Sequence, residues 1–194
     1  MLGKIGDARA FEPLVELLKT GDAAARQAAV SALKALAHPE TVSRLCELLG
    51  ETHTNTREAV IRVVGFFGAK GWANAIFDCS ADADERIRRA AIEQLPFIED
   101  ERAVAALIRA LKEDSSRVRE TAAKALAQVK SEESVAALRE ALGDADAWTR
   151  YFAVRALGTL RDVESREKLS EMAERDAAEH VRAAAQEVLN ELGK

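Results

Sequence analysis

Apolar residues recur at helical spacing along this chain, and the helical segments themselves recur every 31 or 32 residues. An arginine marks the same point in each segment. These arginines are Arg26, Arg57, Arg88, Arg119, Arg150 and Arg182. Small or aliphatic residues stand three positions after each arginine, and apolar residues stand seven and ten positions after it. Because these offsets share one face of an α-helix, each arginine lies in an amphipathic helix, which we call an arginine helix.

A second amphipathic segment follows most arginine helices after a short polar break. A fixed period of this length is typical of a solenoid, in which each repeat buries its apolar face on the next. We therefore predict an all-α fold, an α-solenoid of about six helical hairpins in one domain over residues 1–194. The expected repeats are 1–22 (partial), 23–51, 52–82, 83–114, 115–146, 147–177 and 178–194 (partial), so both ends are expected to be incomplete.

Four stretches show the repeated sequence most clearly. They are LGKIGDARAFEPLVELL (2–18), ERIRRAAIEQL (85–95), SRVRETAAKALAQV (116–129) and AWTRYFAVRALGTL (147–160). This sequence resembles the HEAT repeat, in the short form also found in phycobilin lyases. The resemblance implies a right-handed superhelix of paired helices, with one helix of each pair lining a concave face. It also implies a scaffold or adaptor, because only a few HEAT-like proteins are enzymes.

Composition fits helices with charged outer faces: 48% of the residues are hydrophobic, 31% are charged and 5% are aromatic. The net charge of −5 disfavours a nucleic-acid partner. No apolar run reaches the roughly 18 residues of a membrane span, and the N-terminal residues lack the apolar core of a signal peptide. We therefore expect a cytoplasmic protein without membrane contact.

No residues stand in a catalytic arrangement: G-x-S-x-G, a Gly-rich phosphate loop and H-E-x-x-H are all absent. Cys46 and Cys79 fall on apolar helix faces and are expected to be reduced core residues. HEAT-like hydroxylases carry His-Glu metal pairs, whereas the adjacent pair here is reversed, Glu179-His180. We expect no catalytic residue, no metal and no cofactor.

The six arginines, which we call the arginine ladder, have two interpretations. A basic stripe would suit phosphates. A structural role would place each guanidinium against loop carbonyls or an acidic residue just upstream. Asp22, Asp84 and Asp146 each lie four residues before an arginine, where a carboxylate also suits the start of a helix. We favour the structural role.

Two rows of residues, one and five positions after each arginine, point away from the core. In the middle repeats they carry opposite charges, Glu58–Arg62, Arg89–Glu93 and Glu120–Lys124. The sign also alternates from repeat to repeat, so that Glu58 is expected to pair with Arg89. The rows predict a self-neutralised charge lattice on the concave face, which disfavours a polyanion.

Aromatic residues replace this pattern in the repeat at 147–177. Trp148, Tyr151, Phe152 and Arg155 fall within two helical turns. Trp, Tyr and Arg are enriched in binding hot spots. Phe152 is interpreted either as packing between repeats or as part of a binding surface, and Tyr151 and Arg155 are the expected partner contacts. The full predicted partner-binding set is Trp148, Tyr151, Phe152, Arg155, Lys124, Glu120, Glu93, Arg89, Arg62 and Phe66.

The leading functional hypothesis is a non-catalytic scaffold or adaptor that binds a protein on its concave helix face. The alternative is a phycobilin-lyase-like enzyme or enzyme subunit that holds a tetrapyrrole in the groove. A third hypothesis, DNA binding, is disfavoured by the mixed charges. Apolar residues near the ends, Leu2, Ile5 and Phe11 at one and Val188 and Leu192 at the other, also suggest end-to-end self-association.

Overall fold

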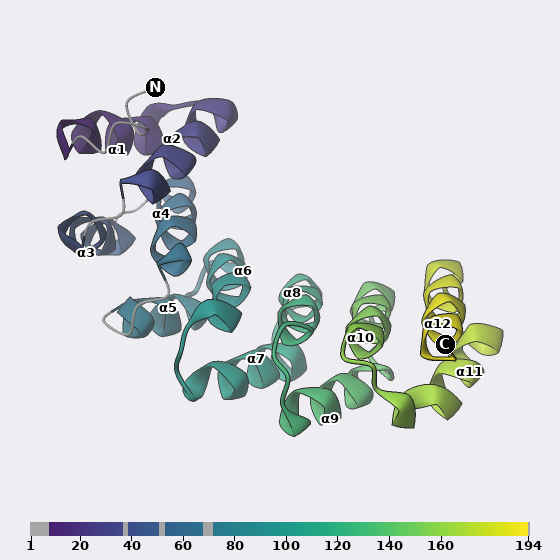
Figure 1. Ribbon diagram of the computed structural model, residues 1–194. Coiled ribbons are helices and arrows are strands. Elements are labelled where there is room, and N and C mark those ends of the chain that lie inside the picture. The colour runs from purple at the N-terminus through teal and green to yellow at the C-terminus, as the bar shows by residue number, and fades with distance from the viewer. Residues whose placement is uncertain (1–7, 37–38, 51–52, 68–71, 194) are drawn as a thin grey trace. The chain divides into compact units, whose positions relative to one another are not determined.

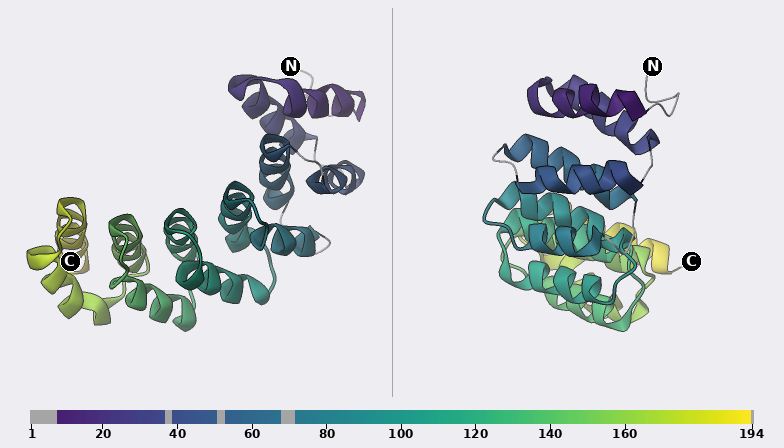
Figure 2. Two further views of the ribbon diagram at one scale, coloured as in Figure 1. Left: turned by 180° about the vertical axis from the view of Figure 1, so that it is seen from behind. Right: turned by 90° about the vertical axis from the view of Figure 1, so that its left-hand side faces the viewer.

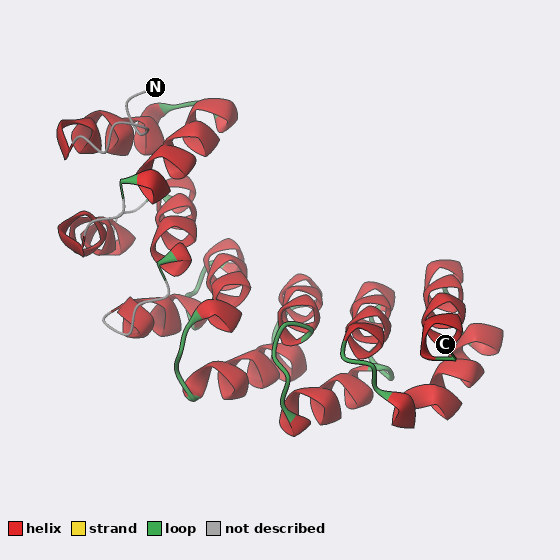
Figure 3. Ribbon diagram, viewed as in Figure 1, coloured by secondary structure: helices red, strands yellow, loops and turns green. Residues whose placement is uncertain are grey.

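The computed structural model describes residues 8–36, 39–50, 53–67 and 72–193, and every regular element in these ranges is helical (Figures 1 and 3). The α-helices are α1 (Phe11–Thr20), α2 (Ala23–Ala35), α3 (Pro39–Glu47), α4 (Thr54–Phe66), α5 (Ala73–Ser80), α6 (Glu85–Gln94), α7 (Arg102–Glu113), α8 (Ser116–Leu126), α9 (Glu132–Ala141), α10 (Ala147–Thr159), α11 (Arg166–Arg175) and α12 (Glu179–Leu192). Short 3₁₀ turns cover Ala8–Ala10, Leu48–Gly50, Leu95–Phe97 and Val163–Ser165. The predicted all-α fold is confirmed.

The chain forms two units, Met1–Asp100 (unit 1) and Glu101–Lys194 (unit 2). In unit 1 the arginine helices α2, α4 and α6 pack side by side, with α1, α3 and α5 packed against them (Figure 2). In unit 2 the arginine helices α8, α10 and α12 form the corresponding layer, and α7, α9 and α11 form the other. This is the layering of an α-solenoid, as predicted. A single domain over 1–194 and a right-handed superhelix stay predictions, and Leu2 and Ile5 lie outside the described residues.

The core follows the arginine register. Every residue three positions after a ladder arginine is buried, and so are all but Leu189 of those seven positions after. Residues ten positions after are buried less evenly: Leu36 and Ile98 are buried, whereas Leu160 is half-buried. The reason is that this offset falls at the helix end, where Leu36 and Leu160 are the C-cap residues. Burial therefore follows the arginine register through the body of each helix and becomes less regular at the helix end.

Two glycines mark places where neighbouring arginine helices approach closely. A Cβ added to Gly65 in α4 would overlap the side chain of Gln94 in α6. A Cβ added to Gly158 in α10 would lie 2.7 Å from Cγ2 of Val188 in α12. Both glycines stand eight positions after a ladder arginine. The contact between α10 and α12 therefore depends on the absence of a side chain at position 158.

The arginine ladder joins the loops that precede successive arginine helices. In unit 2, Nη1 of Arg150 donates to the main-chain carbonyls of Asp144 at 2.8 Å and Ala145 at 3.2 Å, in the loop before its own helix. Its Nε and Nη2 donate to the two carboxylate oxygens of Asp176, both at 2.8 Å, in the loop before α12. The carbonyl of Asp176 in turn accepts from Nη1 of Arg182 at 2.6 Å. Consecutive loops of unit 2 are thus linked in series.

Two further ladder arginines bind a carboxylate in the loop before the next arginine helix. Arg119 donates through Nε and Nη2 to Asp144, each at 2.9 Å. Arg57 forms an ion pair with Asp82 in unit 1. The hydrogen bond from Arg57 holds the pKa of the Asp82 carboxyl below its usual value, and Arg150 lowers the pKa of Asp176 in the same way. The two other ladder arginines, Arg26 and Arg88, donate to carbonyls of the loops before their own helices.

The carboxylates that accept from the arginines are not the ones expected just upstream. Asp22, Asp84 and Asp146 instead cap their helices, each accepting from a main-chain N–H in the first turn. One carboxylate oxygen of each accepts from that amide. The acceptors Asp82 and Asp176 lie six residues before an arginine, but each binds the preceding arginine of the ladder, Arg57 or Arg150.

Arg161 has a φ of 54°, which lies in the left-handed region. It follows the end of α10, where the N–H of Asp162 donates to the carbonyl of Leu157 at 3.0 Å and the N–H of Arg161 donates to that of Gly158 at 3.1 Å. This is a Schellman motif, whose left-handed position is usually glycine. A side chain there crowds the following carbonyl, so the motif stores strain at Arg161.

Arg161→Gly is expected to raise the free energy of unfolding by about 0.5–1 kcal/mol, since the strain relieved exceeds the flexibility added to the unfolded chain. Urea denaturation followed by circular dichroism measures the change. Arg161→Ala keeps the Cβ and should leave stability nearly unchanged. A gain of the same size for Ala would assign the effect to the arginine side chain and not to the backbone.

Candidate partner-binding site

Three aromatic side chains share one face of α10. Trp148, Tyr151 and Phe152 stand at positions i, i+3 and i+4, which are neighbours on a helix surface. The ring centroids of Trp148 and Tyr151 are 5.5 Å apart, those of Tyr151 and Phe152 are 5.0 Å apart, and those of Trp148 and Phe152 are 6.2 Å apart. The opposite face of α10 buries Ala153 and Leu157 in the core. This helix is therefore apolar on both faces, although only one of them packs inside unit 2.

A fourth ring comes from the next arginine helix. His180 in α12 stacks on Trp148 with ring centroids 4.3 Å apart and an interplanar angle of 24°. It also lies 5.8 Å from the ring of Tyr151. We call Trp148, Tyr151, Phe152 and His180 the aromatic cluster. The sequence analysis did not include His180, yet a signal existed: Trp148 and His180 both stand two residues before a ladder arginine.

The aromatic cluster is partly open to solvent. Trp148 is 49% exposed, whereas Tyr151, Phe152 and His180 are half-buried. Phe152 therefore fits both interpretations, packing between repeats and part of a binding surface. One part of its side chain packs on its neighbours, and another part remains accessible. Mutual stacking fixes the rings before any partner arrives, which reduces the entropy lost on binding.

Two cations flank the aromatic cluster. Nζ of Lys124 in α8 lies 3.7 Å from the centroid of the Phe152 ring, a cation–π contact between neighbouring arginine helices. Arg155, one turn after Phe152, forms an ion pair with Glu187 of α12 at 2.9 Å. Arg155 and Glu187 occupy the same offset in successive repeats. Five of the predicted residues, Trp148, Tyr151, Phe152, Arg155 and Lys124, thus lie on α8 and α10. Figure 1 shows these two helices side by side.

The predicted charge lattice is realised only in part. Arg62 pairs with Glu58 at 2.7 Å within α4, as expected. The other carboxylate oxygen of Glu58 accepts from Arg86 at 2.6 Å, and not from Arg89 as predicted. Arg86 stands two residues before its ladder arginine. The contact of Glu58 with the next repeat is therefore made by a residue at that offset.

The remaining predicted residues do not form the expected pairs. Within the described ranges, no ion pair joins Arg89 to Glu93 or Glu120 to Lys124, and Nε of Arg89 is buried without a hydrogen-bond partner. Phe66 is 59% exposed in unit 1, and Nζ of Lys34 lies 4.9 Å from the centroid of its ring. Arg62, Phe66, Arg89 and Glu93 belong to unit 1, whereas the aromatic cluster belongs to unit 2.

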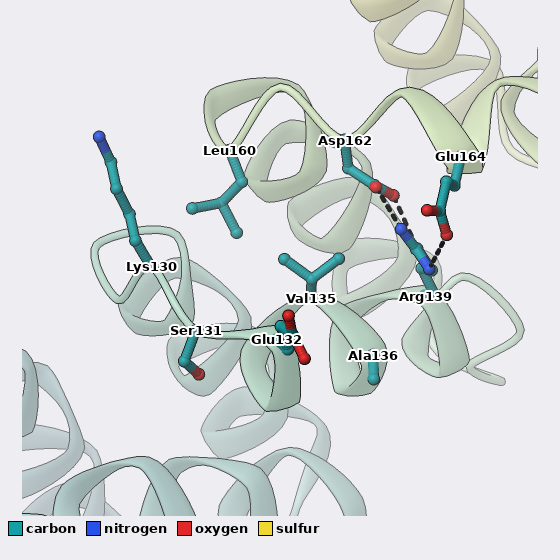
Figure 4. A pocket seen from close by; sticks show the side chains of 9 residues that line it. All are labelled: Lys130, Ser131, Glu132, Val135, Ala136, Arg139, Leu160, Asp162 and Glu164. Atoms are coloured by element: carbon teal, nitrogen blue, oxygen red, sulfur yellow. Dashed lines mark hydrogen bonds and ion pairs between the residues drawn. The ribbon is translucent and has the colours of Figure 1, made fainter.

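A separate groove of about 670 Å³ lies in unit 2 between α9 and the loop that follows α10. Figure 4 shows Val135 and Leu160 facing each other across it, while Arg139 closes one end by pairing with Asp162 and Glu164. Asp162 is 8% exposed, and the hydrogen bond from Arg139 lowers the pKa of its carboxyl. None of the predicted partner-binding residues lines this groove.

The described residues offer little reactive chemistry. No group of three or more His, Cys, Asp or Glu side chains suited to a metal occurs among them. Both cysteines are free thiols, and burial raises the pKa of the Cys79 thiol to about 11, so it is uncharged at neutral pH. Over the same ranges, no helix combines the length and the apolar character needed to cross a lipid bilayer.

Solved structures with the same fold include natural and designed repeat proteins. The Escherichia coli protein YibA superposes with a TM-score of 0.69 at 17% identity, covering 100% of this chain and 74% of that one. A designed armadillo repeat protein in complex with the peptide (KR)4 gives 0.59 at 18% identity, covering 93% and 98%. The complex of CpcE and CpcF of phycocyanin lyase from Nostoc gives only 0.48 at 22% identity, covering 94% and 99%, which is too low to carry an argument. At these identities the likeness concerns the fold alone.

Comparison with curated proteins gives no match. A family profile described as HEAT repeats matches residues 1–60, 45–121 and 110–190, nearly the whole length. The match agrees with the arginine register, the paired helices and the two-layered packing of each unit. The chain therefore belongs to the HEAT-repeat family.

Proposed function

We propose that this chain is a non-catalytic scaffold that binds a protein partner through the aromatic cluster of unit 2. The observation that carries the proposal is the placement of four rings in mutual contact on two neighbouring arginine helices, with Trp148 49% exposed. Three of the nine Phe, Trp and Tyr residues of the chain belong to this cluster. Stacked helices supply a rigid, extended surface, which is how repeat proteins bind their partners.

The arrangement matches the physical requirements of a binding hot spot. Trp and Tyr remove a large apolar area from water while ordering few rotatable bonds. The stack of Trp148 on His180 already holds the indole in place. Lys124 and Arg155 provide polar contacts at the edge of the rings, where interfaces are usually polar.

Replacing Trp148 and Tyr151 together by Ala is expected to weaken partner binding at least about tenfold, since hot-spot truncations cost about 2 kcal/mol or more. The partner is first captured with the wild-type chain from cells of the source organism, and its affinity for each variant is then measured by calorimetry. Val163→Ala is the matched control, because Val163 is 58% exposed in the same unit but outside the aromatic cluster. Equal affinity of the double variant and the wild type would rule out this site.

The tetrapyrrole alternative is tested with the same variants. An induced circular-dichroism band of a bilin that appears with the wild type and is lost with the double variant would show that the site binds a pigment and not a protein partner. Our proposal expects no such band at stoichiometric concentration. Helicity and thermal midpoint are compared first, so that a loss of binding is not confused with a loss of fold.

A further inference from the structure

The polar atoms of the aromatic cluster include two hydrogen-bond donors. The indole N–H of Trp148 and the phenolic O–H of Tyr151 have no hydrogen-bond partner in the described part of the chain, and the phenolic oxygen is not buried. An indole N–H can only donate. Of the two ring nitrogens of His180, only Nε2 is buried without a hydrogen-bond partner.

Positive charge accompanies these donors. Lys124 is exposed, and within the described ranges no carboxylate pairs with it. Arg155 uses Nη1 for Glu187, which leaves its other N–H groups available. Two carboxylates lie close by: Glu187 is engaged by Arg155, and Glu120 is half-buried one helical turn before Lys124. An unpaired cation, Lys124, and the remaining N–H donors of Arg155 thus stand beside the rings.

The face of the Phe152 ring that could accept a cation is already occupied by a residue of the chain itself. Lys124 lies over the ring of Phe152 at 3.7 Å, where a cationic side chain of a partner would otherwise bind. A basic segment brought to the aromatic cluster would meet the like charges of Lys124 and Arg155. An acidic segment would find donors and an unpaired ammonium group beside an apolar ring surface.

We infer that the partner presents an acidic segment, with an Asp or Glu side chain next to an aromatic or large aliphatic one. This inference rests on the proposed function and names the partner class of the same site. The apolar side chain packs on Trp148 and Tyr151, and the carboxylate accepts hydrogen bonds from Lys124 and from the indole or phenol donor. A long polyanion fits less well, because Glu120 and Glu187 interrupt the positive charge and the chain carries a net charge of −5.

The test is a selection of random peptides on the full-length chain. Each round includes counter-selection on the Trp148→Ala, Tyr151→Ala double variant, so that only peptides dependent on the aromatic cluster remain. We expect those peptides to be enriched in Asp and Glu beside Phe, Trp or Leu, relative to the starting library. Titration of a retained peptide that lacks Trp, in the Trp72→Phe background, then gives its affinity from the fluorescence of Trp148 alone.

Charge reversal at the cluster provides the second measurement. Lys124→Glu is expected to weaken the retained peptides on the order of tenfold, because an attraction becomes a repulsion. Lys130→Glu, an equal change at an exposed lysine in the α8–α9 loop, should leave affinity within about twofold. An equal loss for both variants would overturn the inference, since it would reflect only the overall charge.

The selection separates the two levels of the proposal. Retained peptides that are basic, or that show no charge bias, would overturn the acidic partner while leaving the binding site in place. If no peptide distinguishes the wild type from the double variant, both the acidic partner and the proposed site are wrong.

Discussion

Arg150→Ala is expected to lower the free energy of unfolding by about 3 kcal/mol, because it leaves a nearly buried carboxylate without its partner. The side chain of Asp176 is only 7% exposed, and that of Arg150 is 14% exposed. The substitution removes the two hydrogen bonds from Arg150 to this carboxylate, which keeps only the one from the main-chain N–H of Ala178, and the two to the loop before α10. Two consecutive loops of unit 2 thereby lose their connection.

The matched control is Arg155→Ala on the same helix. Arg155 also pairs with a carboxylate, but its side chain and that of Glu187 are 41% and 65% exposed. An exposed pair of this kind contributes less than about 1 kcal/mol. Arg150→Lys keeps the charge but loses the planar fork, and is expected to fall between the two. Urea denaturation monitored by circular dichroism decides the order, and similar losses for Arg150→Ala and Arg155→Ala would show that burial of the pair is unimportant.

The ladder also shows what the sequence predicts and what it leaves open. Six arginines in register identify a repeated structural position, and the loop carbonyls they bind lie five to eight residues before each arginine. The carboxylate partner is harder to find, because Arg150 and Asp176 are 26 residues apart and meet only once successive loops stack. Asp146 was the nearer candidate, but its side chain accepts a hydrogen bond from the main-chain N–H of Thr149 in the first turn of α10.

The aromatic cluster follows the same division between local and distant contacts. Trp148, Tyr151 and Phe152 could be grouped from the sequence because helical spacing alone places them on one face. His180 could not be assigned by that reasoning, since its stack on Trp148 depends on the separation of α10 and α12. The pair Glu58–Arg86 was missed because Arg86 stands two residues before its ladder arginine, at an offset that the charge pattern did not single out.

The separation of α10 and α12 depends on Gly158, and Gly158→Leu is therefore expected to lower the free energy of unfolding by about 2 kcal/mol. Even the first added atom would lie 2.7 Å from Cγ2 of Val188, which is 1% exposed and β-branched, so it cannot turn aside. Overpacking of this kind costs about 1–3 kcal/mol, and the better helix propensity of Leu offsets part of that loss.

Gly143→Leu is the matched control in the same unit, since the nearest neighbour of an added Cβ there is a carbonyl oxygen at 3.6 Å. Val188→Ala removes the two methyl groups that oppose position 158, so adding it to Gly158→Leu should restore part of the stability despite being destabilising alone. A double-mutant cycle with no coupling would show that the two side chains do not compete for the same space.

The same substitution links packing to binding. Moving α12 away from α10 would also disturb the stack of His180 on Trp148, whose ring centroids are 4.3 Å apart. Gly158→Leu is thus expected to weaken the partner about as much as removal of one ring contact, although position 158 does not belong to the aromatic cluster. Unchanged affinity together with reduced stability would mean that the surface formed by α10 alone is sufficient for recognition, and that His180 only supports the fold.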